Sequence, residues 1–452
     1  MQTADPSSSR VATGFRMTRV VACCAGAKSV ASWSKQDGHI SRTLIFYTDN
    51  GKRVVVRLPT PAAGPAGRNV NSEVATIKYL EHGSGIPLHH IWQNLGKVQK
   101  IKCLKSVAQQ LAKSSELCFP AYDSLYLSDT DSLPFSRKVH LSHNFCIGPQ
   151  CEPIEQDLSE KLACVPNGGS WLNMTEFANG LIRLGLSNVA NKNDFWTSNR
   201  CWQGTPKEHA NLLNHARRVL RILAKDPRVV SISTPTMLPC LTLDHTFVKP
   251  GEPETITCMT GWRACPISPA FLFSLNHTVS VPNRYLTSEK TEAHVGLLAY
   301  FDDVLRANIS FHRRYIPRLR SFPAELPRFR SRPTHTHPPD YGQLHELFWF
   351  CHRTWADGIP LVQPGLLRIA DSWRPLGLPG PCPFEPPTGK DLQIHELRSQ
   401  LFADWETRRK EVNFNVGVDE MDHELVQTND WDDVLERLKE ISMSRCREAY
   451  EM

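Results

Sequence analysis

A β-hairpin signal near the N-terminus constrains the fold of this chain more than any other local pattern. Residues 39–47 are rich in Ile, Thr, Leu and Phe, and residues 54–58 form a second apolar run that stops at Pro59. The segment Asp49-Asn50-Gly51 lies between them, and Asn-Gly supplies the positive φ angles of a type I′ turn. The sequence therefore predicts two antiparallel strands joined by a tight turn.

Helical patterns dominate the rest of the chain. Apolar residues recur at helical spacing over four segments, 71–80, 97–112, 171–186 and 209–223. A charged helical tail is expected from about residue 390. Extended structure is expected at 229–240 and a short strand at 255–260. A small unit with strands followed by a larger helical unit indicates the α+β class.

Composition limits how many folded units the chain can form and which classes of partner are expected. The 452 residues are 40% hydrophobic and 22% charged, enough for two or three folded units. A net charge of +6 is only mildly basic, so no nucleic-acid partner is expected. No apolar run is long enough to cross a bilayer, so no transmembrane segment is expected.

The cysteines and the N-terminal segment indicate in which cellular compartment the protein is expected. Fourteen scattered cysteines favour free thiols, and Cys146 and Cys151 have no second pair at zinc-ribbon spacing, so no metal site is predicted. Residues 1–35 hold five basic residues and one acid, which is typical of a mitochondrial targeting segment or of a disordered one. Mitochondrial localisation is therefore expected, with a cytoplasmic protein as the alternative.

Several short strings occur in an order that resembles one protein family. They lie at residues 54–61, 71–76, 119–126, 145–149 and 353–358. Together they resemble the fungal branch of the aminoglycoside phosphotransferase family, whose members are often called altered inheritance of mitochondria proteins. The resemblance covers roughly residues 40–440.

The resemblance implies a protein-kinase-like bilobal fold with a truncated N-lobe and a mainly helical C-lobe. The family has two more strands and an adenine-binding hinge after the helix at 71–80, whereas residues 85–92 resemble the stretch beyond that hinge. About forty residues are therefore predicted to be absent. The expected units are a truncated N-lobe at 36–85, a helical C-lobe with a degenerate catalytic loop at 86–312, and a Pro/Arg-rich connection with a helical C-terminal extension at 313–452.

The family's phosphate-binding pair falls on Arg57 and Glu73. Arginine can bind phosphate and carboxylate bidentately, but an ordinary surface ion pair between strand and helix is an equal interpretation. The phosphate-covering turn falls on residues 34–40, where Gly38 is the only glycine. An ordinary turn is favoured there, because one glycine leaves side chains in the way of phosphate.

The family's catalytic positions are degenerate in this chain. Cys240 falls on the proton-accepting Asp, His245 on the metal-binding Asn and Gly261 on the metal-binding Asp. A thiol is a poor proton acceptor from an alcohol, imidazole suits Mg²⁺ badly, and glycine offers no ligand. Asp244 lies in the same loop, but its spacing is wrong for the base.

These substitutions predict an aminoglycoside phosphotransferase-like protein that is catalytically impaired and acts by binding, as a pseudokinase does. Its partner would be an unknown protein or small molecule. ATP and Mg²⁺ are expected as cofactors only if the family activity is retained, and no Mg²⁺-dependent stabilisation by ATP is expected. The alternatives are an active ATP-dependent phosphotransferase on an unknown small molecule and an interaction protein that uses the Pro- and Arg-rich segment near 313–340.

Overall fold

A computed structural model gives a mixed helix-and-strand fold. It describes residues 21–37, 41–59, 66–80, 85–114, 117–151, 169–190, 200, 202–231, 233–237, 245–260, 262, 265–273, 347–348, 350–416 and 433–437.

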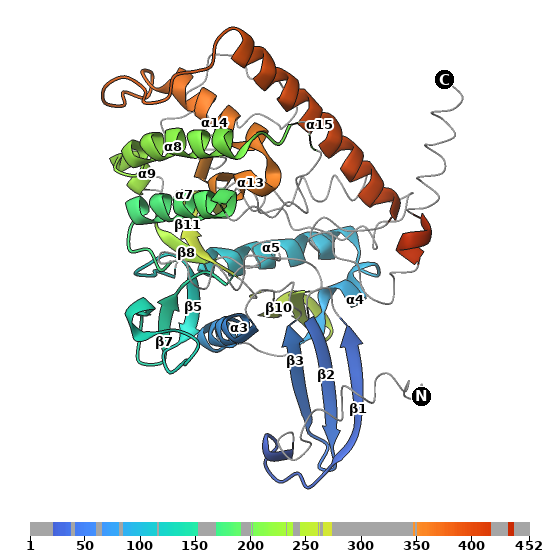
Figure 1. Cartoon of the computed structure of the whole chain (residues 1–452). Helices are drawn as coiled ribbons and strands as arrows, with labels where there is room; N and C mark the ends of the chain where they lie inside the picture. The colour runs from blue at the N-terminus through green and yellow to red at the C-terminus, as the bar shows by residue number, and fades with distance from the viewer. Residues whose placement is uncertain are drawn as a thin grey trace, which may run out of the picture.

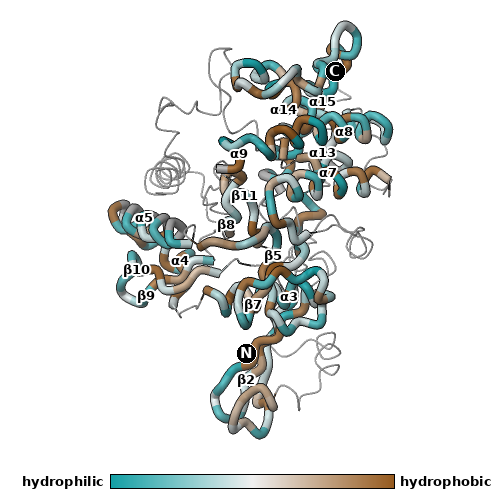
Figure 2. Tube along the Cα trace, turned by 90° about the vertical axis from the view of Figure 1, so that its left-hand side faces the viewer, coloured by the Kyte–Doolittle hydropathy of each residue, from teal (hydrophilic) through white to brown (hydrophobic). Residues whose placement is uncertain are grey.

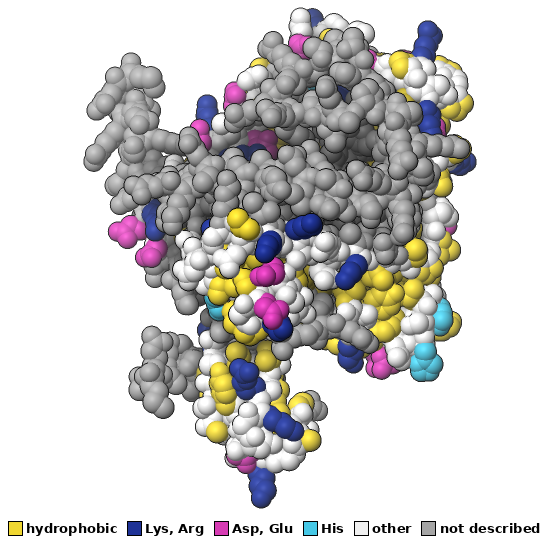
Figure 3. Space-filling view, turned by 180° about the vertical axis from the view of Figure 1, so that it is seen from behind, with side chains coloured by type: hydrophobic (Ala, Val, Ile, Leu, Met, Phe, Trp, Pro, Cys, Tyr) yellow, Lys and Arg dark blue, Asp and Glu magenta, His cyan; other side chains and the backbone are white. Residues whose placement is uncertain are grey.

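Three antiparallel strands form an N-terminal sheet that projects from one end of the molecule (Figure 1). Their order is β1 (Val30–Asp37), β2 (Ser41–Thr48) and β3 (Arg53–Pro59). The predicted hairpin between β2 and β3 is confirmed, with Gly51 at a φ of +78°. Leu44 and Phe46 are fully buried against apolar side chains of the neighbouring strands. Seen from behind, this part carries Lys and Arg side chains among hydrophobic ones (Figure 3).

Strand β1 differs from the sequence-based expectation. It begins at Val30, inside the range 1–35 that was assigned to a targeting or disordered segment. Its polar residues, such as Ser34 and Lys35, hide any apolar alternation. Backbone pairing with β2, from Val30 opposite Thr48 to Asp37 opposite Arg42, defines the strand instead.

Helix α3 (Ala66–Leu80) contains the predicted helix at 71–80 and extends it towards the N-terminus. Beside it lies a second small antiparallel sheet with the order β5 (Ser124–Leu127), β7 (Phe145–Gly148) and β6 (Val139–His140). Two antiparallel strands therefore do follow α3, but later in the chain than expected. Helix α5 (Lys97–Ser114) is part of the longer segment that separates them from α3 in sequence.

A third antiparallel sheet joins distant parts of the chain. Its order is β10 (Glu252–Met259), β9 (Thr246–Lys249) and β4 (Ile86–Pro87), and β4 leads directly into α4 (Leu88–Trp92). The predicted strand at 255–260 is confirmed within β10. Because Tyr79 and Leu80 of α3 pack against the core that contains Leu88, residues on both sides of the predicted boundary at 85/86 share one core.

The largest core lies among helices at the other end of the molecule (Figure 1). These are α7 (Met174–Ala190), α8 (Pro206–Leu223), α13 (Thr354–Asp357) and α14 (Ile359–Ser372). Leu213, Leu220 and Val362 are among its most buried residues. Hydrophobic residues are prominent along α13 and α14 in Figure 2. Helix α15 (Lys390–Val416) confirms the predicted charged helix and runs along one side.

The segment at 229–240 is less extended than predicted. Its first residues belong to helix α9 (Pro227–Ser231), which begins where the Asp226 side chain accepts the backbone N–H of Arg228 at 2.8 Å. Among the described residues of this segment, strand structure is limited to β8 (Pro235–Met237), which pairs with β11 (Ile267–Pro269). An acceptor at the start of a helix satisfies free backbone donors, and this local capping outweighs the β-branched composition.

Candidate functional site

Arg57 and Glu73 meet between the projecting sheet and α3. Alternation along β3 places Arg57 on the face opposite the Leu44–Phe46 cluster, and α3 packs against this strand. The guanidinium forms an ion pair with the Glu73 carboxylate, and its Nε donates to Oγ of Ser41 at 2.9 Å. The Arg57 side chain remains 39% exposed. The structure therefore holds a cation in place while leaving part of it open to an anion.

The predicted phosphate-covering turn, residues 34–40, precedes the strands that carry Ser41 and Arg57. The connection between β1 and β2 is the segment 38–40, which contains Gly38 and lies outside the described residues. The preceding residues of the predicted phosphate-covering turn, up to Asp37, belong to β1. The chain thus runs from the β1–β2 connection to a cation on β3 and a carboxylate on the following helix, α3.

His245 lies at the start of the β9–β10 hairpin. Its backbone carbonyl accepts the N–H of Thr260 at 2.7 Å, and the Thr260 hydroxyl also donates to it at 3.4 Å. Thr260 immediately precedes Gly261 in sequence. The sites at Cys240 and Gly261 themselves, with Asp244, lie outside the described residues.

Trp262 anchors the far side of this hairpin. It is buried, and its indole N–H donates to the carbonyl of Met259 at 2.6 Å. Ile267 then pairs with Asp123, so the segment that follows reaches the β5 region. The hairpin is thus fixed at both ends.

The sequence does not predict strands β5 and β7, which lie beside α3. Asn71 on α3 accepts the backbone N–H of Leu127 at 2.9 Å, and the ring of Tyr79 meets that of Phe145 edge-on at 5.2 Å. These contacts attach β5 and β7 to the helix that carries Glu73. The short apolar runs at 124–127 and 145–148 were the available signal, but runs of four residues do not distinguish strand from loop.

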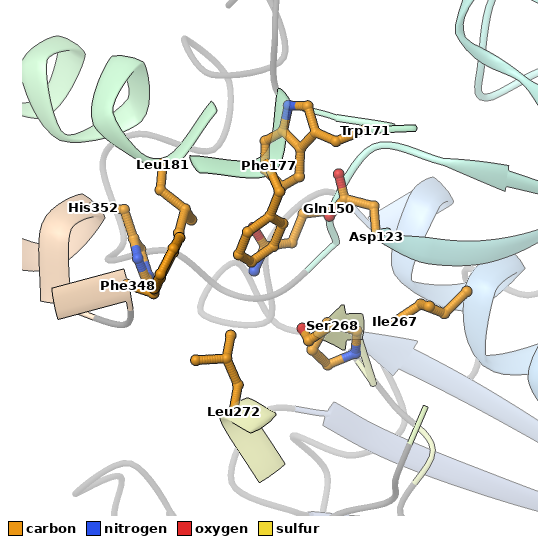
Figure 4. A pocket seen from close by; sticks show the side chains of 11 residues that line it. Asp123, Gln150, Trp171, Phe177, Leu181, Ile267, Ser268, Leu272, Phe348 and His352 are labelled. Atoms are coloured by element: carbon orange, nitrogen blue, oxygen red, sulfur yellow. The ribbon is translucent and has the colours of Figure 1, made fainter. Parts of the chain in front are cut away.

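A small cavity of about 20 Å³ lies beyond the end of β7 (Figure 4). Asp123 and Gln150 line one side, and His352 lines another with aromatic rings. The cavity has room for about one water molecule. Burial lowers the pKa of His352 to about 3, so this imidazole is neutral near pH 7.

Asp123 has an unusual backbone for a residue other than glycine. It is 2% exposed and its φ is +126°. Its backbone N–H and carbonyl both pair with Ile267. Gly169, itself at a φ of +99°, leaves the space that the Asp123 carboxylate occupies. Three segments distant in sequence therefore converge on this side chain.

The described residues contain no cluster of three or more His, Cys, Asp or Glu arranged to hold a metal ion. Cys146 and Cys151 are both buried free thiols. None of the helices that the structure describes has the length and hydrophobicity needed to cross a bilayer.

Comparisons with known proteins give distant relatives. No family model matches the chain. Two subtelomeric hrmA-associated cluster proteins, from two strains of Aspergillus fumigatus, are 25% and 24% identical over an alignment of 299 residues, and the match covers 52% of this chain. The chain covers 58% of the length of each of these curated relatives. Neither name concerns mitochondrial inheritance.

Solved structures with some similarity are phosphotransferases. A macrolide 2'-phosphotransferase type I is 12% identical, with a TM-score of 0.30, and the match covers 70% of this chain and 90% of that one. The ADP-bound aminoglycoside phosphotransferase APH(2'')-Ib is 9% identical, with a TM-score of 0.30 and coverage of 69% and 98%.

Proposed function

We propose that this chain is a kinase-like phosphotransferase-family protein that binds a phosphate-containing ligand through Arg57 and is impaired in phosphoryl transfer. The observation that carries the proposal is the ion pair between Arg57 on β3 and Glu73 on α3. A cation that is held by a carboxylate on the next helix is the arrangement that a nucleotide kinase uses to hold phosphates.

The local geometry suits an anion. Glu73 and Ser41 fix the guanidinium from two sides, so little side-chain freedom remains to be lost on binding. Guanidinium groups bind phosphate oxygens through parallel N–H donors. The ligand would therefore contact the exposed part of Arg57 without first breaking the ion pair.

The impairment rests on residue chemistry. Mg²⁺ prefers oxygen ligands, whereas His245 offers nitrogen and Gly261 offers no side chain. Cys240 carries no fixed negative charge to accept a proton. Binding that does not depend on Mg²⁺, with very slow transfer, follows from these three substitutions.

The strands β5 and β7 bear on the expectation that two strands and an adenine-binding hinge are absent. Nucleotide binding was doubtful because two strands and a hinge were expected to be absent after the helix at 71–80. We propose that β5 and β7 are those strands, since both contact α3, through Leu127 and Phe145 respectively. A nucleotide is therefore a reasonable first ligand to test.

Thermal denaturation with ATP, with and without Mg²⁺, tests the proposal. ATP should raise the melting temperature of the wild type to the same extent with Mg²⁺ or with EDTA, because a ligand of the folded state stabilises it. Arg57→Gln should abolish the shift. Arg53→Gln, which removes an exposed cation from the same strand, should keep it. A wild type that is not shifted by ATP would refute the proposal.

An active ATP-dependent phosphotransferase on an unknown small molecule is the alternative. The retained Arg57–Glu73 pair and the contact between His245 and Thr260 favour it. ADP release measured with Mg²⁺ or Mn²⁺ decides between the two. Turnover that is lost in Arg57→Gln and depends on the metal would establish the enzyme.

A further inference from the structure

The turn between β2 and β3 contains Asn50-Gly51, a dipeptide that can lose ammonia without an enzyme. The backbone nitrogen of Gly51 gives up its proton and bonds to Cγ of Asn50, and the side-chain amide nitrogen takes up a proton and leaves as ammonia. Water then opens the resulting succinimide to aspartate or isoaspartate. Glycine favours ring closure because it has no Cβ in the way. Both residues are exposed at the outer end of the projecting sheet, where water reaches them (Figure 1).

The folded turn holds both reacting groups in hydrogen bonds. The backbone N–H of Gly51 donates to the carbonyl of Thr48 at 3.0 Å. Oδ1 of Asn50 accepts from the hydroxyl of Thr48 at 2.7 Å and from the backbone N–H of Lys52 at 3.3 Å. Nδ2 of Asn50 donates to the carbonyl of Ala25 at 3.2 Å. Ring closure requires this side chain to rotate, so the turn must first open.

Another Asn-Gly pair provides a comparison inside the same chain. Asn179 and Gly180 lie in the interior of α7, and Gly180 is buried against the ring of Trp171. A reaction there requires α7, which belongs to the main core, to unwind. Opening the exposed turn at Asn50 costs less free energy than unwinding a core helix. A third Asn-Gly pair, at 167–168, lies outside the described residues.

The turn also binds the segment that precedes β1. The Asp49 carboxylate accepts the backbone N–H of Lys28 at 3.0 Å. The Asn50 amide and the Lys52 ammonium both donate to the carbonyl of Ala25, at 3.2 and 2.9 Å. Deamidation replaces the Asn50 amide with a carboxylate, which cannot donate to a carbonyl. Isoaspartate also places Cβ in the main chain and so lengthens the turn.

We propose that Asn50 is a deamidation site that reacts when the β2–β3 turn opens locally, and that its conversion loosens residues 24–29 from the turn. The fold slows the reaction at Asn50 without abolishing it, whereas Asn179 reacts only when α7 unwinds. No step involves Arg57, so the inference is independent of the proposed function.

Peptide mapping by mass spectrometry, at neutral pH and physiological temperature, measures the rates in the intact chain. A synthetic peptide of residues 47–54 provides the unrestrained rate. Asn50 in the intact chain should convert at least about tenfold more slowly than in the peptide, and faster than Asn179. Conversion at the rate of the peptide would show that the turn does not restrain the reaction. Conversion no faster than at Asn179, or none at either site, would show that the turn does not open locally. Each of these results would overturn the inference.

The variant Asn50→Asp, which carries one of the two products, tests the loosening. Hydrogen exchange in residues 24–29 should be at least about fivefold faster than in the wild type, with exchange in α7 unchanged. Asn144→Asp adds the same charge at another exposed position and should leave exchange in residues 24–29 unchanged. Wild-type exchange in residues 24–29 of a folded Asn50→Asp variant would overturn the proposed loosening.

Discussion

Arg398 of α15 donates to the carboxylate of Glu208 at 2.8 Å, and the same carboxylate accepts the backbone N–H of Thr205. Thr205 and Glu208 form a capping box at the start of α8. The Glu208 carboxylate therefore caps the N-terminus of α8 and also binds the charged helix α15 to it.

Arg398→Gln should loosen α15 more than it destabilises the whole chain. The pair is partly exposed, so we expect a loss of only about 0.5–1 kcal/mol in unfolding free energy. Hydrogen exchange should nevertheless rise in residues 390–416, because local opening costs less there. Arg408→Gln, an exposed cation on the same helix, is the control. Unchanged exchange in Arg398→Gln would show that this contact does not hold the helix.

Gly169→Ala should be strongly destabilising. A methyl group there would meet the Asp123 carboxylate, and alanine would also have to adopt a φ of +99°. We expect a loss of about 2–4 kcal/mol in denaturant unfolding. Gly251→Ala is the matched control, because Gly251 has a φ of +81° and open space around it, so it should cost only about 1 kcal/mol. Equal losses in both variants would mean that the Asp123 contact is unimportant.

Acid should destabilise the fold through a buried histidine. Burial lowers the pKa of His209 from 6.5 to about 4, and its ring lies within hydrogen-bond distance of the Gln203 carbonyl and the Thr354 hydroxyl. Below pH 6.5 the unfolded chain takes up a proton that the folded chain does not. Stability is therefore unaffected by this group above pH 6.5 and falls between pH 6.5 and 4, by up to about 3 kcal/mol.

Chemical denaturation across that pH range measures the effect. His209→Gln should be less stable at pH 7 but should show a shallower decline towards pH 4. His143→Gln, at an exposed position, should follow the wild-type curve. A decline that is as steep in His209→Gln as in the wild type would assign the acid sensitivity to other groups, such as His352.

Glu73→Gln should separate the structural role of the ion pair from ligand binding. The two side chains are 39% and 18% exposed, so the pair contributes at most about 1 kcal/mol to stability. The freed Arg57 would lose its fixed orientation, and ATP affinity should fall about fivefold, equivalent to about 1 kcal/mol. Isothermal titration measures this, with Glu252→Gln, from the exposed pair with Lys249, as the control. Unchanged affinity would mean that Glu73 does not position Arg57.

Local chemistry made the hairpin and the long helices predictable. The Asn-Gly turn and the apolar spacing of α8 each determine an element within a few residues. The pairing of Arg57 with Glu73 was predicted as an implication of the family resemblance, and the structure contains this ion pair. Its chemical role remains a prediction.

The elements that the sequence did not predict depend on pairing between residues far apart in the chain. β1 is polar and is defined by its backbone partner β2, whereas β5 and β7 acquire their place through contacts with α3. The Asp123 cluster is a further example, because residues near 123, 169 and 267 meet there with no shared local pattern. Such arrangements depend on tertiary packing that short windows do not contain.

The pairing of Ile86 with Val248 affects how the chain is made. β4 and α4 leave the ribosome long before β9 does, so their partner strand does not yet exist. During that interval the core around Leu88 and Trp92, both buried in the finished fold, lacks the side chains that Val248 and Met259 contribute. Nascent chains halted before residue 246 should therefore bind Hsp70-type chaperones, and release should follow once β9 has been synthesised.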